Sequence, residues 1–182
     1  IMSKIYPVIL CGGLSTRLWP AQLPKQFMKL FGDNTLVQET IIRATQILDN
    51  AEPPLLVTNQ TYLKILTQQV KEINAPYTGI IAEPVSRNTG PAVLMSALHL
   101  AQYSSLDDII VLMPSDHQIE DLEGMKAGLQ RAVKLAKLGA IVVLGIKPTG
   151  PSSQFGYIEP DELIPKTQGE LTEAYSIKQF VE

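Results

Sequence analysis

Short apolar runs rich in β-branched residues alternate along the chain with longer segments of helical periodicity. The apolar runs are bounded by polar or turn-forming residues, which is typical of buried strands. We predict strands at residues 5–10, 55–58, 79–82, 109–113 and 140–146, and helices at residues 35–48, 60–71, 90–103 and 122–138. Strands that alternate with helices indicate βαβ units. The pattern therefore predicts an α/β protein with a Rossmann-like, doubly wound, mostly parallel sheet and helices on both faces.

The segment at residues 35–48 shows the clearest helical pattern, because one set of its side chains recurs at steps of three and four. These side chains predict a buried stripe: Leu36, Thr40, Ile41, Ala44, Ile47 and Leu48. The polar residues between them are expected to face water: Gln38, Glu39, Arg43 and Gln46.

The character of the chain changes after residue 146, where Pro148, Gly150 and Pro151 interrupt the periodicity. Strand-like pieces at residues 157–159 and 176–181 follow, joined by polar turns, and they predict a hairpin excursion near the C-terminus. We find no repeat and no linker long enough to divide the chain. The sequence thus predicts one domain over residues 1–182.

Composition narrows the classes of partner. The chain has 182 residues, of which 45% are hydrophobic and 18% charged, with a formal net charge of −3. No basic field would attract nucleic acid or an anionic membrane, so a small molecule is the better expectation. The single cysteine, Cys11, cannot form an internal disulfide, and no leader segment or long apolar span is visible. We therefore expect a soluble, cytoplasmic protein.

A glycine pair, Gly12 and Gly13, follows the first predicted strand, with Arg17 and Lys25 further along the same loop. Glycine lets the backbone approach a ligand closely, and successive N–H groups there can bind phosphate oxygens. The two cations suit a triphosphate, although a tight turn with two solvated cations would give the same residues. Neither the dinucleotide-binding nor the P-loop fingerprint fits these residues, which argues against a dehydrogenase and a P-loop kinase.

Two further segments place polar residues after predicted strands. Asn88 or Thr89 can cap the helix that follows the strand at residues 79–82. Asp116 and His117 follow the strand at residues 109–113, where ligand crevices of open α/β sheets lie. Asp116 can bind Mg²⁺ through its carboxylate, or it can cap the next turn, and His117 can be an ordinary surface residue.

These segments together resemble the sugar-nucleotide pyrophosphorylases, a nucleotidyltransferase family. Gly-Gly-x-x-Thr-Arg-Leu-Trp-Pro at residues 12–20 and Pro-Lys-Gln-Phe at 24–27 are similar to the signature loop of its mannose-1-phosphate guanylyltransferase branch. Glu-Pro-x-x-Arg-Asn-Thr at residues 83–89 and Pro-Ser-Asp-His at 114–117 also match motifs of that branch. Weaker matches lie around residues 145–149, 155–158 and 180–182, so the blocks run in the family's order along the chain.

The resemblance implies transfer of a guanylyl group from GTP to mannose 1-phosphate, giving GDP-mannose and pyrophosphate without a covalent intermediate. The implied nucleotide-binding residues are Leu10, Gly12, Gly13, Thr16, Glu83, Asn88 and Thr89. Arg17 and Lys25 are the implied phosphate contacts and, with the implied Mg²⁺ ligand Asp116, the catalytic residues. Gly156, Tyr157 and Glu182 are the implied contacts to the sugar. Guanine has donors at N1 and N2, so the carboxylate of Glu83 suits it as a pair of acceptors.

Two other functions stay open at this point. One is a related transferase with another base or sugar. The other is a non-catalytic module that binds a nucleotide or GDP-mannose, because Ser15 stands where the family usually has glycine and the loop before Lys25 is shorter. The chain stops before the lysine and the second metal-binding aspartate that the resemblance implies. We therefore expect a fragment that binds GTP without turnover, and a homodimer is left open.

Overall fold

The structure is a computed structural model that describes residues 3–12, 23–153, 155–164 and 174–181. The chain forms two compact units, Ile1–Gln130 and Arg131–Glu182, and each is described separately below. The boundary falls inside one helix, α4 (Leu122–Ala136). This division describes compactness in space and does not test the domain organisation. A single nucleotidyltransferase domain over residues 1–182 therefore stays a prediction.

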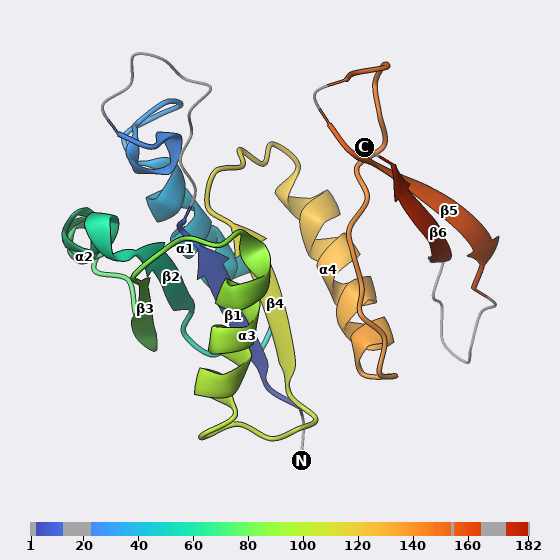
Figure 1. Cartoon of the computed structure of the whole chain (residues 1–182), viewed down its shortest axis with the longest axis horizontal. Helices are drawn as coiled ribbons and strands as arrows, with labels where there is room; N and C mark the ends of the chain where they lie inside the picture. Colours follow the sequence, from blue (N-terminus) through green and yellow to red (C-terminus); the bar gives the residue numbers. More distant parts are fainter. Residues whose placement is uncertain (1–2, 13–22, 154, 165–173, 182) are drawn as a thin grey trace. The chain divides into compact units, whose positions relative to one another are not determined.

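The first unit is built on a parallel four-stranded sheet (Figure 1). Its strands are β1 (Ile5–Leu10), β2 (Leu55–Asn59), β3 (Gly79–Glu83) and β4 (Ile109–Pro114). Their order is β3-β2-β1-β4, so the chain moves outward from β1 to β3 and then crosses back to β4. All four strands end at the same edge, which we call the carboxyl edge.

Helices cover both faces of this sheet: α1 (Leu36–Ile47) lies behind it in Figure 1, and α3 (Thr89–Leu100) lies in front. The remaining helices of the unit are α2 (Leu63–Glu72), the start of α4, and the short 3-10 helices η1 (Lys25–Phe27) and η2 (Gln60–Tyr62). Beneath α3, alternate side chains of β1 and β2 form a core with Ala92 and Leu100. The predicted doubly wound α/β fold is confirmed.

Helix α1 begins with a capping box, in which Thr35 and Gln38 bond each other's backbone N–H groups. Its predicted buried stripe is confirmed, and so is the exposure of Glu39 and Gln46. The prediction that Gln38 and Arg43 face water is wrong, because they are only 2% and 7% exposed. Each donates hydrogen bonds inside the fold, which periodicity alone does not reveal.

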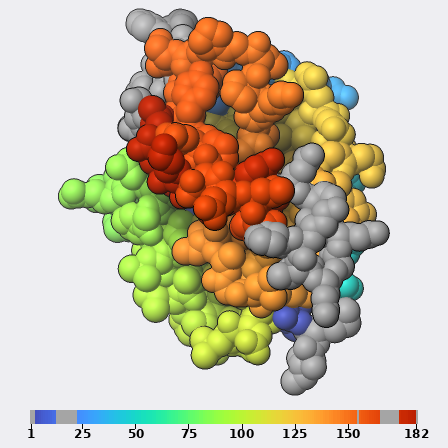
Figure 2. All heavy atoms as spheres, turned by 90° about the vertical axis from the view of Figure 1, so that its right-hand side faces the viewer, coloured from blue at the N-terminus to red at the C-terminus, as the bar shows by residue number. Residues whose placement is uncertain are grey.

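The second unit contains a two-stranded antiparallel hairpin of β5 (Tyr157–Leu163) and β6 (Tyr175–Val181), which confirms the predicted excursion. Its side chains form part of the surface in Figure 2, and every residue of β6 is exposed. The predicted strand at residues 140–146 is wrong. No strand ladder includes these residues, and Ile141 and Ile146 are 98% and 88% exposed. An apolar run becomes a strand only when a neighbour accepts its backbone hydrogen bonds.

Candidate functional site

Segments far apart in the sequence meet at the carboxyl edge because parallel strands end together there. Gly12 follows β1, Glu83 is the last residue of β3, and Asp116 follows β4. The register pairs Leu10 with Pro114, so the turns after β1 and β4 leave the sheet at the same level. This edge is where open α/β sheets bind ligands.

Glu83 lies beside the start of the glycine turn. A Cβ atom added to Gly12 would lie 3.6 Å from Glu83 Oε2, while Gly12 itself is exposed. The Glu83 side chain is 4% exposed, and burial raises the pKa of its carboxyl group. Across the described residues, no hydrogen bond or ion pair reaches its oxygens. Glu83 thus offers two acceptors next to a backbone segment that a ligand can approach.

Lys25 and Asp116 form an ion pair, with Lys25 Nζ 2.8 Å from Asp116 Oδ2. Lys25 opens η1, and about a third of each side chain is exposed. His117 Nε2 lies 3.6 Å from the other carboxylate oxygen, Asp116 Oδ1. The predicted phosphate-binding lysine and the predicted metal ligand therefore meet at the carboxyl edge.

Buried polar side chains fix the backbone at the end of β1. Gln26 Nε2 donates to the Cys11 carbonyl at 3.2 Å, and Ser115 Oγ donates to the Leu10 carbonyl at 2.8 Å. Thr58 Oγ1 lies 3.5 Å from the same Cys11 oxygen. Gln26 and Ser115 lie within matched motifs, but sequence reasoning assigned none of the three residues a role, since each acts through a backbone carbonyl distant in the sequence. Burial also raises the pKa of the Cys11 thiol to about 12, which keeps it protonated.

A buried network behind η1 holds the segment that carries Lys25. Gln69 Nε2 donates to the Phe27 carbonyl at 3.1 Å, and Gln69 Oε1 accepts from Thr35 Oγ1 at 2.9 Å. Gln38 Nε2 donates to the Gln69 carbonyl at 2.9 Å. Helices α1 and α2 thereby share one amide network with η1.

Replacing Gln69 by alanine is expected to lower the free energy of unfolding by about 2 to 4 kcal/mol, because buried partners lose their bonds and a cavity forms. Urea denaturation measures the loss. Gln68→Ala is the matched control, since Gln68 is exposed and bonds only Glu72 on the surface. Equal losses for the two variants would contradict a structural role for the network.

Asn88 occupies the N-cap position of α3, but its side chain makes no capping hydrogen bond. Its backbone has a positive φ, with φ 60° and ψ −159°, a strained conformation that glycine adopts far more readily than any other residue. Thr89 is the first residue of the helix. The capping explanation therefore holds for the position of Asn88 and not for its side chain, which stays available to a ligand.

The other predicted site residues fall into two groups. Gly13, Thr16, Arg17 and Glu182 lie outside the described residues. Gly156 and Tyr157 belong to the second unit, where Tyr157 Oη accepts from Ser152 N at 2.7 Å and donates to its carbonyl at 3.0 Å. The structure brings Gly12 next to Glu83 and Lys25 next to Asp116, and it places both pairs at the same edge as Leu10, Asn88 and Thr89.

The possible metal ligands around Asp116 can be compared with what the predicted Mg²⁺ requires. Within the described ranges, no group of three or more His, Cys, Asp or Glu side chains could hold an ion. Mg²⁺ usually takes only one or two protein carboxylates and completes its shell with phosphate oxygens and water. A single carboxylate beside the lysine predicted to bind phosphate would suit an ion that is shared with a bound triphosphate.

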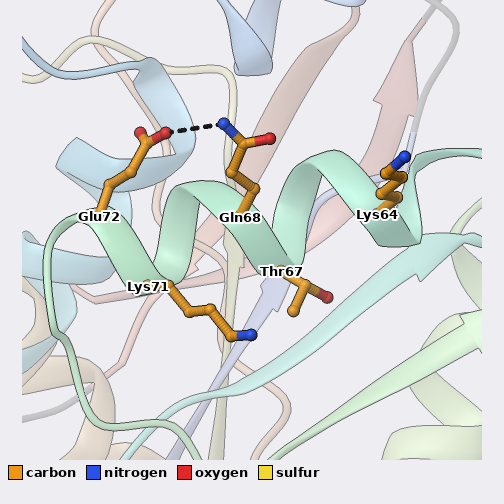
Figure 3. A pocket seen from close by; sticks show the side chains of 5 residues that line it. All are labelled: Lys64, Thr67, Gln68, Lys71 and Glu72. Carbon is orange, nitrogen blue, oxygen red and sulfur yellow. Dashed lines mark hydrogen bonds between the residues drawn. The ribbon is translucent and has the colours of Figure 1, made fainter.

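A shallow hollow elsewhere on the first unit is lined by side chains of α2 alone (Figure 3). They are Lys64, Thr67, Gln68, Lys71 and Glu72. Gln68 donates to Glu72 across one helical turn at 3.1 Å. None of the predicted site residues lines this hollow, so it adds nothing to the site at the carboxyl edge.

The chain is thus an open α/β protein whose candidate site lies at the carboxyl edge of the sheet, beside a glycine turn. The chain belongs to the nucleotidyl transferase family, since the model of that family, described as "Nucleotidyl transferase", matches residues 6–182. It is 35% identical over 184 residues to the mannose-1-phosphate guanylyltransferase of Escherichia coli (strain K12), covering 99% of this chain and 38% of that protein. It is 38% identical over 180 residues to the alginate biosynthesis protein AlgA of Pseudomonas aeruginosa, covering 97% of this chain and 36% of that protein.

Two solved structures are similar to this chain in fold. Mannose-6-phosphate isomerase from Helicobacter pylori matches with a TM-score of 0.73 and 27% identity, covering 98% of this chain and 60% of that chain. A second structure, 4-diphosphocytidyl-2C-methyl-D-erythritol synthase, shares the fold at a TM-score of 0.50 and 13% identity, covering 99% of this chain and 68% of that chain. Among the helices that the structure describes, none is long and apolar enough to cross a membrane.

Proposed function

We propose that the protein transfers a guanylyl group from GTP to mannose 1-phosphate, giving GDP-mannose and pyrophosphate. The observation that carries this proposal is the meeting of Gly12, Glu83 and the Lys25–Asp116 pair at one edge of the sheet. Family membership and the guanylyltransferase relatives support it. The chain spans 38% of the length of the first of these relatives. The activity of the whole protein is therefore proposed, and it does not follow from the similarity alone.

Each residue has a distinct part in this reaction. The Glu83 carboxylate accepts from N1–H and N2–H of guanine, and the exposed backbone of Gly12 lets the nucleotide lie close to it. Lys25 neutralises phosphate charge, together with Arg17. Asp116 would hold Mg²⁺, which when bound would supply positive charge to neutralise and align the phosphates. Catalysis then comes from alignment and charge, as in other phosphoryl transfers. Gly156, Tyr157 and Glu182 contact the sugar.

The direct test is pyrophosphate release by full-length protein with GTP, Mg²⁺ and mannose 1-phosphate. UTP, CTP, dTTP and ATP are offered in competition, and we expect release with GTP to exceed release with each of them. GTP binding without pyrophosphate release would identify a binding module. Release that favours another triphosphate would identify a related transferase with a different base.

The glycine turn can be tested by Gly12→Ala. The added Cβ would meet Glu83 Oε2 at 3.6 Å, an ordinary contact, and Gly12 does not have a positive φ, so the fold should tolerate it. We expect GTP affinity to fall by about tenfold or more, because the methyl group occupies the place where a ligand approaches the backbone. Calorimetry measures the affinity, and thermal unfolding checks the fold.

Gly32→Ala is the matched control, since a Cβ at Gly32 would meet nothing within 4 Å. Equal GTP affinity in both variants would place the nucleotide elsewhere. An unfolded Gly12→Ala protein would show instead that Gly12 has a structural role.

A further inference from the structure

Arg43 is a buried cation with no ion pair among the described residues. It lies on α1 with 7% of its surface exposed, and its Nε atom is buried without a hydrogen-bond partner. Its Nη2 donates to Thr40 Oγ1 at 2.8 Å and to the His117 carbonyl at 3.3 Å. Burial lowers the pKa of the guanidinium, and the charge of Glu39 opposes that effect in part.

Packing alone does not explain an arginine at this position. A charged group taken out of water without a direct ion pair costs stability, and even complete buried ion pairs can often be replaced by apolar residues of similar volume without loss. The rest of the buried stripe of α1 is largely apolar. Among the described residues, the long-range bond of Arg43 reaches the backbone of the turn that follows β4.

That turn is fastened on both sides of Asp116. On one side, Ser115 N lies 3.2 Å from the Leu10 carbonyl, and Ser115 Oγ lies 2.8 Å from the same oxygen. On the other side, the His117 carbonyl accepts from Arg43. Asp116 lies between the two fixed points, with its side chain directed to Lys25.

We propose that Arg43 is a positioning residue for Asp116: by holding the His117 carbonyl, it keeps the Asp116 carboxylate at the carboxyl edge opposite Lys25. The planar guanidinium can bond a side-chain hydroxyl and a backbone carbonyl together, whereas a lysine ammonium at this position has fewer and less directed donors. The role of the Asp116 carboxylate in catalysis rests on the proposed guanylyl transfer. The positioning of that carboxylate by Arg43 does not depend on the proposed function.

The placement is tested by amide hydrogen exchange and urea unfolding of the chain, comparing wild type, Arg43→Met and Arg43→Lys. We expect Arg43→Met to unfold at the same or a higher urea concentration. The Ser115 amide should exchange at least about tenfold faster relative to amides within β4, because only the turn opens. Arg43→Lys should be intermediate. Arg131→Met, at an exposed position, controls for the change of residue type and should change neither quantity.

Two results would overturn the proposal. One is unchanged Ser115 exchange in Arg43→Met. The other is a loss of protection shared by the whole sheet, which would show that Arg43 supports the fold in general.

Pyrophosphate release by full-length protein gives the second readout. A misplaced carboxylate should lower kcat by about tenfold to a hundredfold in Arg43→Met, with little change in KM for GTP and partial rescue in Arg43→Lys. Wild-type kcat in Arg43→Met would overturn the positioning role. If wild-type protein itself released no pyrophosphate, the proposed function would fail, and the exchange experiment would still decide the role of Arg43.

Discussion

Replacing Asp116 by asparagine is expected to reduce pyrophosphate release by full-length protein by about a hundredfold or more, while the fold and most of the GTP affinity remain. Asparagine keeps the shape of the side chain and removes the charge that a hard cation requires. The ion pair with Lys25 is lost as well, but both side chains are about a third exposed. Pairs of that kind contribute only about 0 to 1 kcal/mol to stability. The loss should therefore appear in alignment of the reacting groups and not in folding.

Three measurements separate these effects. Pyrophosphate release gives the rate, calorimetry gives GTP affinity, and Mn²⁺ titration in the presence of GTP reports the metal without turnover. Asp107→Asn is the matched control, because Asp107 is an exposed carboxylate in the loop before β4, at the opposite end of the same strand. Wild-type rate and Mn²⁺ affinity in Asp116→Asn would assign the metal to other groups. A similar loss in Asp107→Asn would point to a general effect of charge.

Much of the fold could be predicted because burial on both faces of a parallel sheet leaves continuous apolar runs. The predicted strand at residues 5–10 has the observed bounds of β1, and the strands at 55–58 and 79–82 each extend by one residue. The same kind of run at residues 140–146 is not a strand. Composition reports the tendency of a segment to be buried, whereas a strand also needs a paired neighbour, which only the tertiary structure supplies.

The site was predictable only in part, for a related reason. Gly12, Glu83 and Asp116 each follow or end a predicted strand, and parallel strands bring such residues to one edge. The roles of Arg43 and Gln26 could not be found in this way, since both act through hydrogen bonds to distant backbone carbonyls. Helical periodicity assigned Arg43 to the solvent because it counts polarity and contains no information on partners.

Glu83→Gln is expected to make the free protein more stable and its nucleotide site less selective. The Glu83 carboxyl group is 4% exposed, and no described residue pairs with it. Its raised pKa means that the folded state binds protons more readily than the unfolded state at this group. Stability therefore falls as pH rises from the unfolded pKa through the folded pKa, and the penalty persists above it. The variant removes this penalty at pH 7, and the two proteins should converge below the unfolded pKa.

Whereas stability should rise in Glu83→Gln, the selectivity of the site for guanine should fall. The carboxylate offers two acceptors to the N1–H and N2–H donors of guanine, whereas a glutamine amide places a donor against a donor. Bonds to charged groups contribute roughly 1.5 to 3 kcal/mol each, so the preference for GTP over ATP should fall by about tenfold or more. Calorimetry with both nucleotides and urea unfolding at pH 7 and at acidic pH measure the two effects. Glu120→Gln, at an exposed position, is the control and should change neither. If Glu83→Gln gained stability and kept its discrimination, base recognition would belong to the backbone around residues 10–13, and the burial of Glu83 would need another cause.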